Sequence, residues 1–230
     1  MRARPVLSLL IPVAAAALFI SLGLWQIDRG REVAAANEGL RARLDATPVP
    51  FASLSSDTAH QRLVPVSLVG RFRYDLEQVE AGRTNRGSPG VHLLTPLERD
   101  GRDTLVLVVR GWVYSPNAAD VELARWREAE RVELTGYAMP LPDSGPPAPQ
   151  ADSVPLRSLN RAALESRIGA PLAATYVVMT SDSTARIDSV PRRLPPAVLS
   201  NGPHRSYAIQ WFSFAAIALV GGYVLFRRSA

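Results

Sequence analysis

The chain has 230 residues, 47% of them hydrophobic and 20% charged, which allows one domain of ordinary size plus terminal segments and excludes a second large domain. It contains no cysteine, which excludes disulfide-linked scaffolds, thiol redox proteins and thiol metallochaperones. The formal net charge is +5 at pH 7, but the excess flanks two apolar terminal segments, so the middle of the chain is almost neutral and no nucleic-acid partner is predicted. The flanking basic residues are Arg2, Arg4, Arg205, Arg227 and Arg228.

The first apolar segment, residues 6–27, carries no charge and is long enough to span a bilayer, because about 20 apolar residues cross the hydrocarbon core. Pro12 lies inside it, as membrane helices tolerate. A basic start followed by an alanine-rich run also fits a cleaved secretory signal. The uncharged run continues to Trp25 and Gln26, which favours a membrane span after a short tail of residues 1–5.

Residues 28–203 are predicted to form one domain. Residues 31–46 have helical composition and indicate a stalk that leaves the membrane. Strands are expected where apolar residues alternate or run together, and an Asp-Gly turn between two such runs predicts a hairpin. The predicted strands are residues 63–74, 76–80, 91–97, 104–114, 131–139 and 175–180, with 105–109 buried on both faces.

Composition predicts helices at residues 117–130 and 156–168, a turn at 87–90 and a proline-rich loop at 140–149. Residues 191–203, also proline-rich, are predicted to form a semi-rigid extended connector to the second span. The predicted fold class is therefore α+β: two transmembrane helices flank a β-rich domain, barrel-like or sandwich-like, with a few helices.

The second span is residues 204–226, with aromatic residues at both rims, followed by a basic tail of residues 227–230. Because both tails are basic, we expect both termini in the cytoplasm and the domain in the periplasm or outside the cell, anchored in the plasma (inner) membrane of a bacterium. Gly221 and Gly222 indicate either close approach of another helix or two flexible glycines facing lipid.

The sequence contains no recognisable catalytic or phosphate-binding motif, so an enzyme is not predicted. The histidines lie far apart in sequence, so only folding could bring His60 and His92 together as metal ligands. His204 lies at the mouth of the second span, where Tyr207, Ala208 and Trp211 follow on the same helical face. A neutral imidazole there suits a haem-iron ligand with aromatic walls, and the alternative is a histidine at the level of the lipid headgroups.

Three arginines of the predicted β region, Arg83, Arg86 and Arg110, have guanidinium groups that can hold carboxylates such as haem propionates or acidic side chains of a partner. The alternative is that they are ordinary surface or ion-pair residues.

Four segments resemble, in the same order, motifs of the surfeit locus protein 1 family. Residues 22–29 resemble L-G-x-W-Q-x-x-R, residues 90–97 resemble G-x-x-x-x-T-P-L, residues 107–113 resemble V-x-R-G-W-V, and residues 204–212 resemble H-L-x-Y-A-x-x-W-F. Two departures are Arg205 in place of Leu and the Gly202-Pro203 spacing before His204. The matched positions include Gly23, Trp25, Gln26, Arg29, Arg110, Gly111 and Trp112.

The resemblance implies an assembly factor for cytochrome c oxidase that binds haem a transiently and assists its insertion into the large catalytic subunit. His204 would be the iron ligand, Tyr207 and Trp211 would be the walls of the site, and haem a synthase is a possible second partner. Two other hypotheses stay open: a scaffold for the oxidase subunit or haem a synthase that binds no haem, and a membrane-tethered enzyme with unrecognised catalytic residues.

Overall fold

The computed structural model describes residues 4–55, 57–144, 155–182, 191–195 and 199–229. The chain forms two compact units, a helical pair from Met1–Arg41 and Val198–Ala230 and a β domain from Ala42–Ala197.

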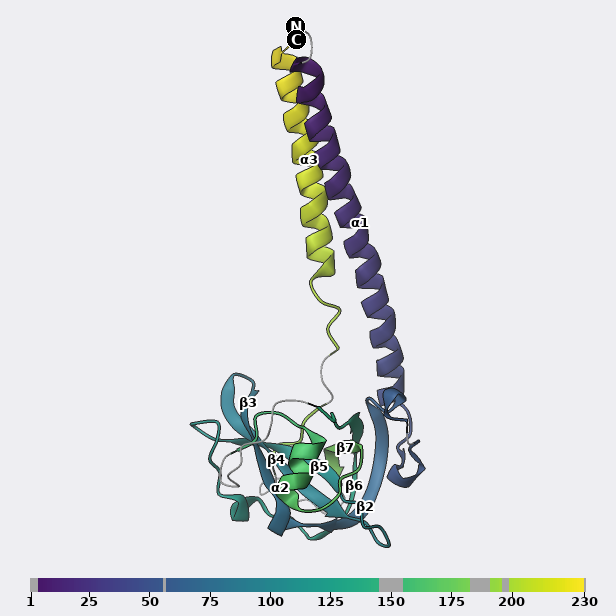
Figure 1. Ribbon diagram of the computed structural model, residues 1–230, viewed down its shortest axis with the longest axis vertical. Coiled ribbons are helices and arrows are strands. Elements are labelled where there is room, and N and C mark those ends of the chain that lie inside the picture. The colour runs from purple at the N-terminus through teal and green to yellow at the C-terminus, as the bar shows by residue number, and fades with distance from the viewer. Residues whose placement is uncertain (1–3, 56, 145–154, 183–190, 196–198, 230) are drawn as a thin grey trace. The chain divides into compact units, whose positions relative to one another are not determined.

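The helical pair consists of α1 (Arg4–Leu44) and α3 (His204–Ser229), which lie side by side (Figure 1). Both helices are long and apolar enough to cross a membrane. Their large apolar side chains are exposed, for example Ile11 at 63% and Ile217 at 67%, as expected for side chains that face lipid. The predicted membrane protein with a span near each end is therefore supported.

α1 continues past the apolar segment without a break, so the predicted stalk is the last part of the same helix. Pro12 lies inside α1 without ending it.

The β domain contains one seven-stranded sheet in the order β1-β2-β6-β7-β5-β4-β3. A further pairing of β2 with β4 closes five strands into a ring, so the domain is barrel-like (Figure 1). Most pairs are antiparallel, and β5–β7 and β1–β2 are parallel. The strands are β1 (Val49–Pro50), β2 (Val64–Phe72), β3 (Gln78–Asn85), β4 (Ser88–Glu98), β5 (Val106–Tyr114), β6 (Arg131–Pro140) and β7 (Thr175–Asp182).

β5 lies between β7 and β4 in the sheet, and eight of its consecutive residues, Val106 to Val113, are buried. Val106 and Val108 join the main core with apolar residues of β2, β6 and β7. Val113 joins a second cluster with Val91 and Leu93 of β4 on the other side. Burial on both faces explains why this strand lacks the alternation of apolar and polar residues seen in half-exposed strands.

The predicted helix at residues 117–130 is wrong. The segment forms turns and one short 3-10 helix, η4 (Leu123–Trp126). The Asn117 side-chain oxygen accepts hydrogen bonds from the backbone N–H groups of Ala119 and Asp120, at 3.1 and 3.0 Å. Such local bonds compete with helix formation, which composition alone does not register.

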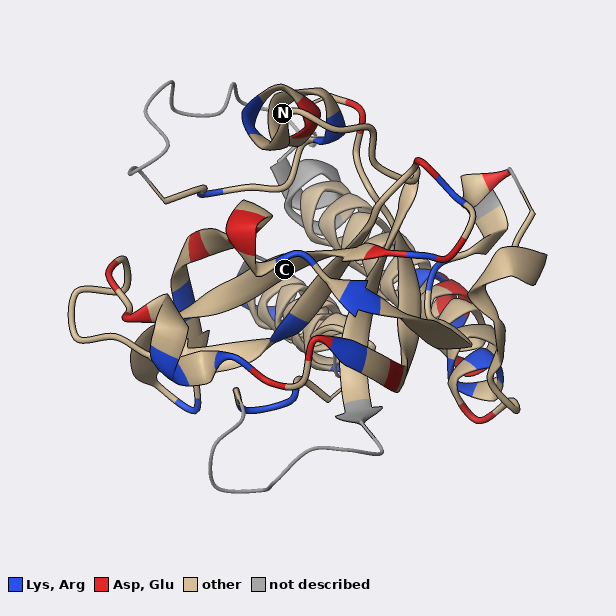
Figure 2. Cartoon of the chain, turned by 90° about the horizontal axis from the view of Figure 1, so that it is seen from below, with Lys and Arg blue, Asp and Glu red and all other residues tan. Residues whose placement is uncertain are grey.

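The second predicted helix starts later than expected, as α2 (Arg161–Ile168), because Asn160 caps it by accepting a hydrogen bond from the backbone N–H of Ala163. β3 begins two residues later than predicted and extends to Asn85. The predicted turn at 87–90 is wrong for three of its four residues, because β4 already begins at Ser88 and the turn is made by Arg86 and Gly87, both with positive φ. Of the predicted loop and connector, residues 145–149 and 196–198 lie outside the described residues. Figure 2 shows basic and acidic residues interleaved over the strands and loops of the domain.

Candidate functional site

Three glycines mark the closest approaches between α1 and α3. A Cβ atom at Gly23 would lie 2.6 Å from the Phe212 ring, and one at Gly222 would lie 2.5 Å from Cβ of Pro12. A Cβ at Gly30 would lie 3.1 Å from Cβ of His204. Small residues at such positions let membrane helices pack closely. Of the two alternatives for Gly221 and Gly222, close approach of another helix holds for Gly222, whereas a Cβ at Gly221 would meet no atom within 4 Å.

Aromatic rings of the two helices also pack against one another. Trp211 stacks on Phe19 of α1 with ring centroids 5.8 Å apart, and Phe214 lies 5.9 Å from Trp211. The Trp211 ring is therefore used in packing the two helices together.

His204 is the first residue of α3, and its imidazole points to α1. Nδ1 lies 2.9 Å from Oε1 of Gln26. Since an amide oxygen only accepts, a neutral imidazole in this contact carries its proton on Nδ1 and its lone pair on Nε2. Nε2 forms no hydrogen bond with any residue that the structure describes. The contact leaves Nε2 available to bind another group.

Residues 199–202 hold the start of α3 in place. Nδ2 of Asn37 donates to the Ser200 carbonyl oxygen and to Oδ1 of Asn201, at 3.0 and 2.8 Å. Gly202 has a positive φ of 70°, and a Cβ there would lie 3.3 Å from Nε2 of His204. A glycine at 202 therefore serves both the turn and the space beside the imidazole.

A groove with a volume of about 470 Å³ runs beside His204, between the two helices. Each helix contributes a face of residues spaced by about one turn, positions 26, 27, 30, 31 and 34 of α1 and positions 204, 205, 208, 209 and 212 of α3. The lining residues are Gln26, Ile27, Gly30, Arg31, Ala34, Asn201, Gly202, His204, Arg205, Ala208, Ile209 and Phe212.

The other residues expected at this site lie elsewhere on the helices. Tyr207 is 47% exposed and Trp25 58% exposed. Trp25, Tyr207 and Trp211 are not among the lining residues, so the role of Tyr207 and Trp211 as walls of a haem site stays a prediction. Arg29 forms an exposed ion pair with Glu32 at 2.8 Å.

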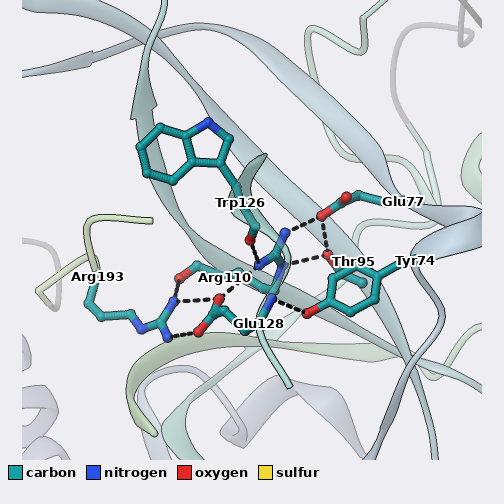
Figure 3. Close-up of polar contacts among 7 residues, drawn as sticks. All are labelled: Tyr74, Glu77, Thr95, Arg110, Trp126, Glu128 and Arg193. Carbon is teal, nitrogen blue, oxygen red and sulfur yellow. Dashed lines mark hydrogen bonds and ion pairs between the residues drawn. The ribbon is translucent and has the colours of Figure 1, made fainter. Parts of the chain in front are cut away.

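In the β domain, Arg110 is the most deeply buried charged residue and the centre of a polar network (Figure 3). Its guanidinium pairs with Glu77 and, at 2.8 Å, with Glu128, and Nε donates to Thr95 Oγ1 at 2.8 Å. Thr95 in turn donates to Glu77 at 2.7 Å. Desolvation lowers the pKa of Arg110, but the attraction of Glu77 and the other partners exceeds it, so the pKa lies above the usual value.

The same network holds the segment that leads out of the domain. Arg193 donates to the backbone carbonyl of Arg110 at 2.7 Å and also pairs with Glu128. Residue 192 exchanges two backbone hydrogen bonds with Trp112, and Gly111 is packed against Arg192 at a position where a Cβ would lie 2.6 Å from its carbonyl oxygen. The connector thus contacts three successive residues of β5, Arg110, Gly111 and Trp112.

The remaining candidates of the domain are paired locally. Arg83 forms an ion pair with Glu80, which also lies 3.1 Å from His92. His60 lies 3.4 Å from Asp57, so the two histidines have different partners. Among the described residues, no group of three or more His, Asp or Glu side chains is arranged to hold a metal ion. For Arg83 and Arg110, ion pairing within the domain is the alternative that the contacts support.

A model of the SURF1 family matches residues 13–216, which cover most of α1, the whole β domain and the first half of α3. The chain belongs to the SURF1 family. Membership in this family is consistent with a role in cytochrome c oxidase assembly.

Relatives of the chain are similar over almost its whole length. An uncharacterised SURF1-like protein of Mycobacterium bovis is 27% identical over 223 residues, covering 91% of this chain and 79% of the relative. A SURF1-like protein of Rickettsia conorii is 25% identical over 216 residues, covering 92% and 87%. Surfeit locus protein 1 of Xenopus tropicalis is 23% identical over 225 residues, covering 91% and 71%.

The motifs of the SURF1 family meet in pairs in this structure. Those of the two spans meet where Gly23 packs on Phe212 and Gln26 contacts His204. Those of the domain meet where Arg110 donates a hydrogen bond to Thr95. They meet again where Trp112 packs on Gly90, since a Cβ added at Gly90 would lie 2.4 Å from the indole nitrogen.

Sequence reasoning missed most residues that line the groove. Arg31 and Ala34 belong to the predicted stalk, and Gly30 is given no role, although the spacing of all three from Gln26 puts them on one helical face. The same spacing from His204 would have found Ile209 and Phe212. Glu77, Glu128 and Arg193 had no signal, because they are far from Arg110 in sequence.

We expect Gly23→Val to destabilise the helical pair by about 1–3 kcal/mol, because the new side chain would overlap the Phe212 ring. Thermal unfolding of the full chain in detergent micelles measures the effect. Gly221→Val is the matched control, since it adds the same side chain to a membrane helix where no atom lies within 4 Å. Equal losses in both variants would show that the contact does not hold the helices together.

Proposed function

We propose that this SURF1-family protein binds haem a in the groove between α1 and α3 and assists its insertion into the large catalytic subunit of cytochrome c oxidase. The observation that carries the proposal is the contact of Gln26 with Nδ1 of His204, which leaves the Nε2 lone pair free beside the groove.

The residues of the groove fit a haem. Neutral imidazole is the form that binds iron, and a hydrogen bond at the other ring nitrogen is the usual way to orient such a ligand. The groove volume lies within the range of small-molecule sites. Its wall is apolar at Ile27, Ile209 and Phe212, which suits a porphyrin face. When bound, haem a would supply the iron that accepts the Nε2 lone pair.

In this proposal the rest of the chain anchors the groove in the membrane and contacts the partner protein. The two helices anchor it in the plasma membrane of a bacterium, with both basic tails in the cytoplasm and the β domain on the opposite side. The domain contacts the oxidase subunit, with haem a synthase as a second partner in this proposal. The protein carries haem a transiently and does not transform it, so it is a chaperone and not an enzyme.

A cellular experiment separates this proposal from a scaffold that binds no haem. Cells that make haem a and lack their own SURF1-family protein would express the wild-type chain or His204→Ala, and the large oxidase subunit would be purified from each. With His204→Ala we expect the subunit to be present but depleted of haem a, because delivery fails while protein contacts remain. A normal haem a content would favour the scaffold.

A further inference from the structure

The groove beside His204 carries positive charge as well as apolar surface. Arg31 and Arg205 both line it, and none of its described lining residues is acidic. Arg31 pairs with Asp28 on its own helix at 3.3 Å, but both side chains are at least 70% exposed, so this pair is weak. Arg205 forms no ion pair with any residue that the structure describes. Both guanidinium groups are available to an anion in the groove.

The charged and apolar parts of the groove are separated along the helices. Arg205 lies next to His204, and Gly30, the neighbour of Arg31, packs on His204. Ile209 and Phe212 lie five and eight residues beyond His204 on α3, which is about 8–12 Å at a rise of about 1.5 Å per residue. The groove thus offers cations at the level of the imidazole and apolar surface deeper in the span. A ligand with an apolar body and carboxylates at one end is complementary to this arrangement.

We propose that Arg31 and Arg205 form a subsite for the two propionate carboxylates of the porphyrin whose iron His204 holds. This inference rests on the proposed function and adds the group that orients the ligand. Guanidinium groups match carboxylates with paired hydrogen bonds, and such pairs strengthen near the apolar phase. Arg205 stands where the family motif has Leu, so one of the two cations of this subsite is a departure from the motif.

The test compares two probes on the full chain in neutral detergent micelles. Iron protoporphyrin IX carries both propionates, and its dimethyl ester carries none while keeping the iron and the apolar ring. Dissociation constants come from titrations followed by visible absorption. We expect the wild type to prefer the diacid, and Arg31→Gln and Arg205→Gln each to weaken diacid binding roughly threefold to tenfold while leaving the diester constant unchanged.

The double variant Arg31→Gln/Arg205→Gln is expected to bind acid and ester equally. Arg29→Gln is the matched control, because Arg29 lies on the same helix but pairs with Glu32 and does not line the groove. Equal wild-type affinity for acid and ester would overturn the subsite and leave the haem proposal intact. Binding of neither probe would contradict haem binding itself and the subsite with it. Unchanged diester binding also shows that the variants are folded.

Discussion

Arg110→Met is expected to lower the free energy of unfolding of the β domain by about 3–5 kcal/mol. The guanidinium is fully buried, and its partners Glu77 and Glu128 have side chains only 1% and 3% exposed. Removing the cation leaves Glu77 with only the Thr95 hydroxyl as a partner in a site that water does not reach, and its Oε2 already has no partner among the described residues. Glu128 loses one of its two cations and keeps Arg193. The cost of uncompensated buried charge therefore exceeds any gain from a methionine of similar length.

Urea unfolding of the full chain in micelles, followed by tryptophan fluorescence, measures this effect, because Trp112 and Trp126 report on the β domain. Arg131→Met is the control, because it also removes an arginine from an ion pair, with Asp100 at 2.9 Å, but that pair is mostly exposed. We expect a change below about 1 kcal/mol for the control. Similar values for both variants would mean that the Arg110 network does not stabilise the domain.

Gln26→Leu is expected to weaken haem binding by about tenfold to a hundredfold, the usual effect of losing the residue that orients a ligating histidine. Leucine has nearly the same size but no oxygen to accept the Nδ1 proton of His204. The imidazole would then rotate or carry its proton on Nε2, the nitrogen assigned to iron. A titration of the full chain with haem in micelles measures the loss.

Gln26→Glu is the control for this second prediction. A carboxylate at position 26 still accepts from Nδ1–H, so binding should stay within a few-fold of the wild type and the iron ligation should strengthen. If the leucine and glutamate variants lose affinity equally, the hydrogen bond is not what positions His204.

The sequence predicted the main architecture because the relevant signals are local. Uncharged runs identified both spans, the Asp-Gly turn identified the β4–β5 hairpin, and an unbroken apolar run identified β5 as buried on both faces. The motifs gave the family for the same reason, since each is a short contiguous string. They did not say which contacts they make, because Gly23 meets Phe212 and Thr95 meets Arg110 only in the folded chain.

The failures have identifiable physical causes. The segment at residues 117–130 has helical composition, but the side chain of Asn117 bonds the backbone and makes a turn instead. For the candidate site, the sequence predicted His204 with Tyr207 and Trp211 as walls, which stays a prediction, but it did not predict the residues of α1 that line the groove. The side chains of α3 that line the groove are those that face α1. The spacing of residues along α3 alone does not reveal where α1 lies.

The visible absorption spectrum of the protein purified from membranes that make haem a is the most direct test of whether the protein binds haem a through His204. We expect a haem a spectrum for the wild type that is lost in His204→Ala and retained in Tyr207→Phe, because Tyr207 does not line the groove. The absence of a haem a signal in the wild type, or an unchanged signal in His204→Ala, would contradict haem a binding through His204.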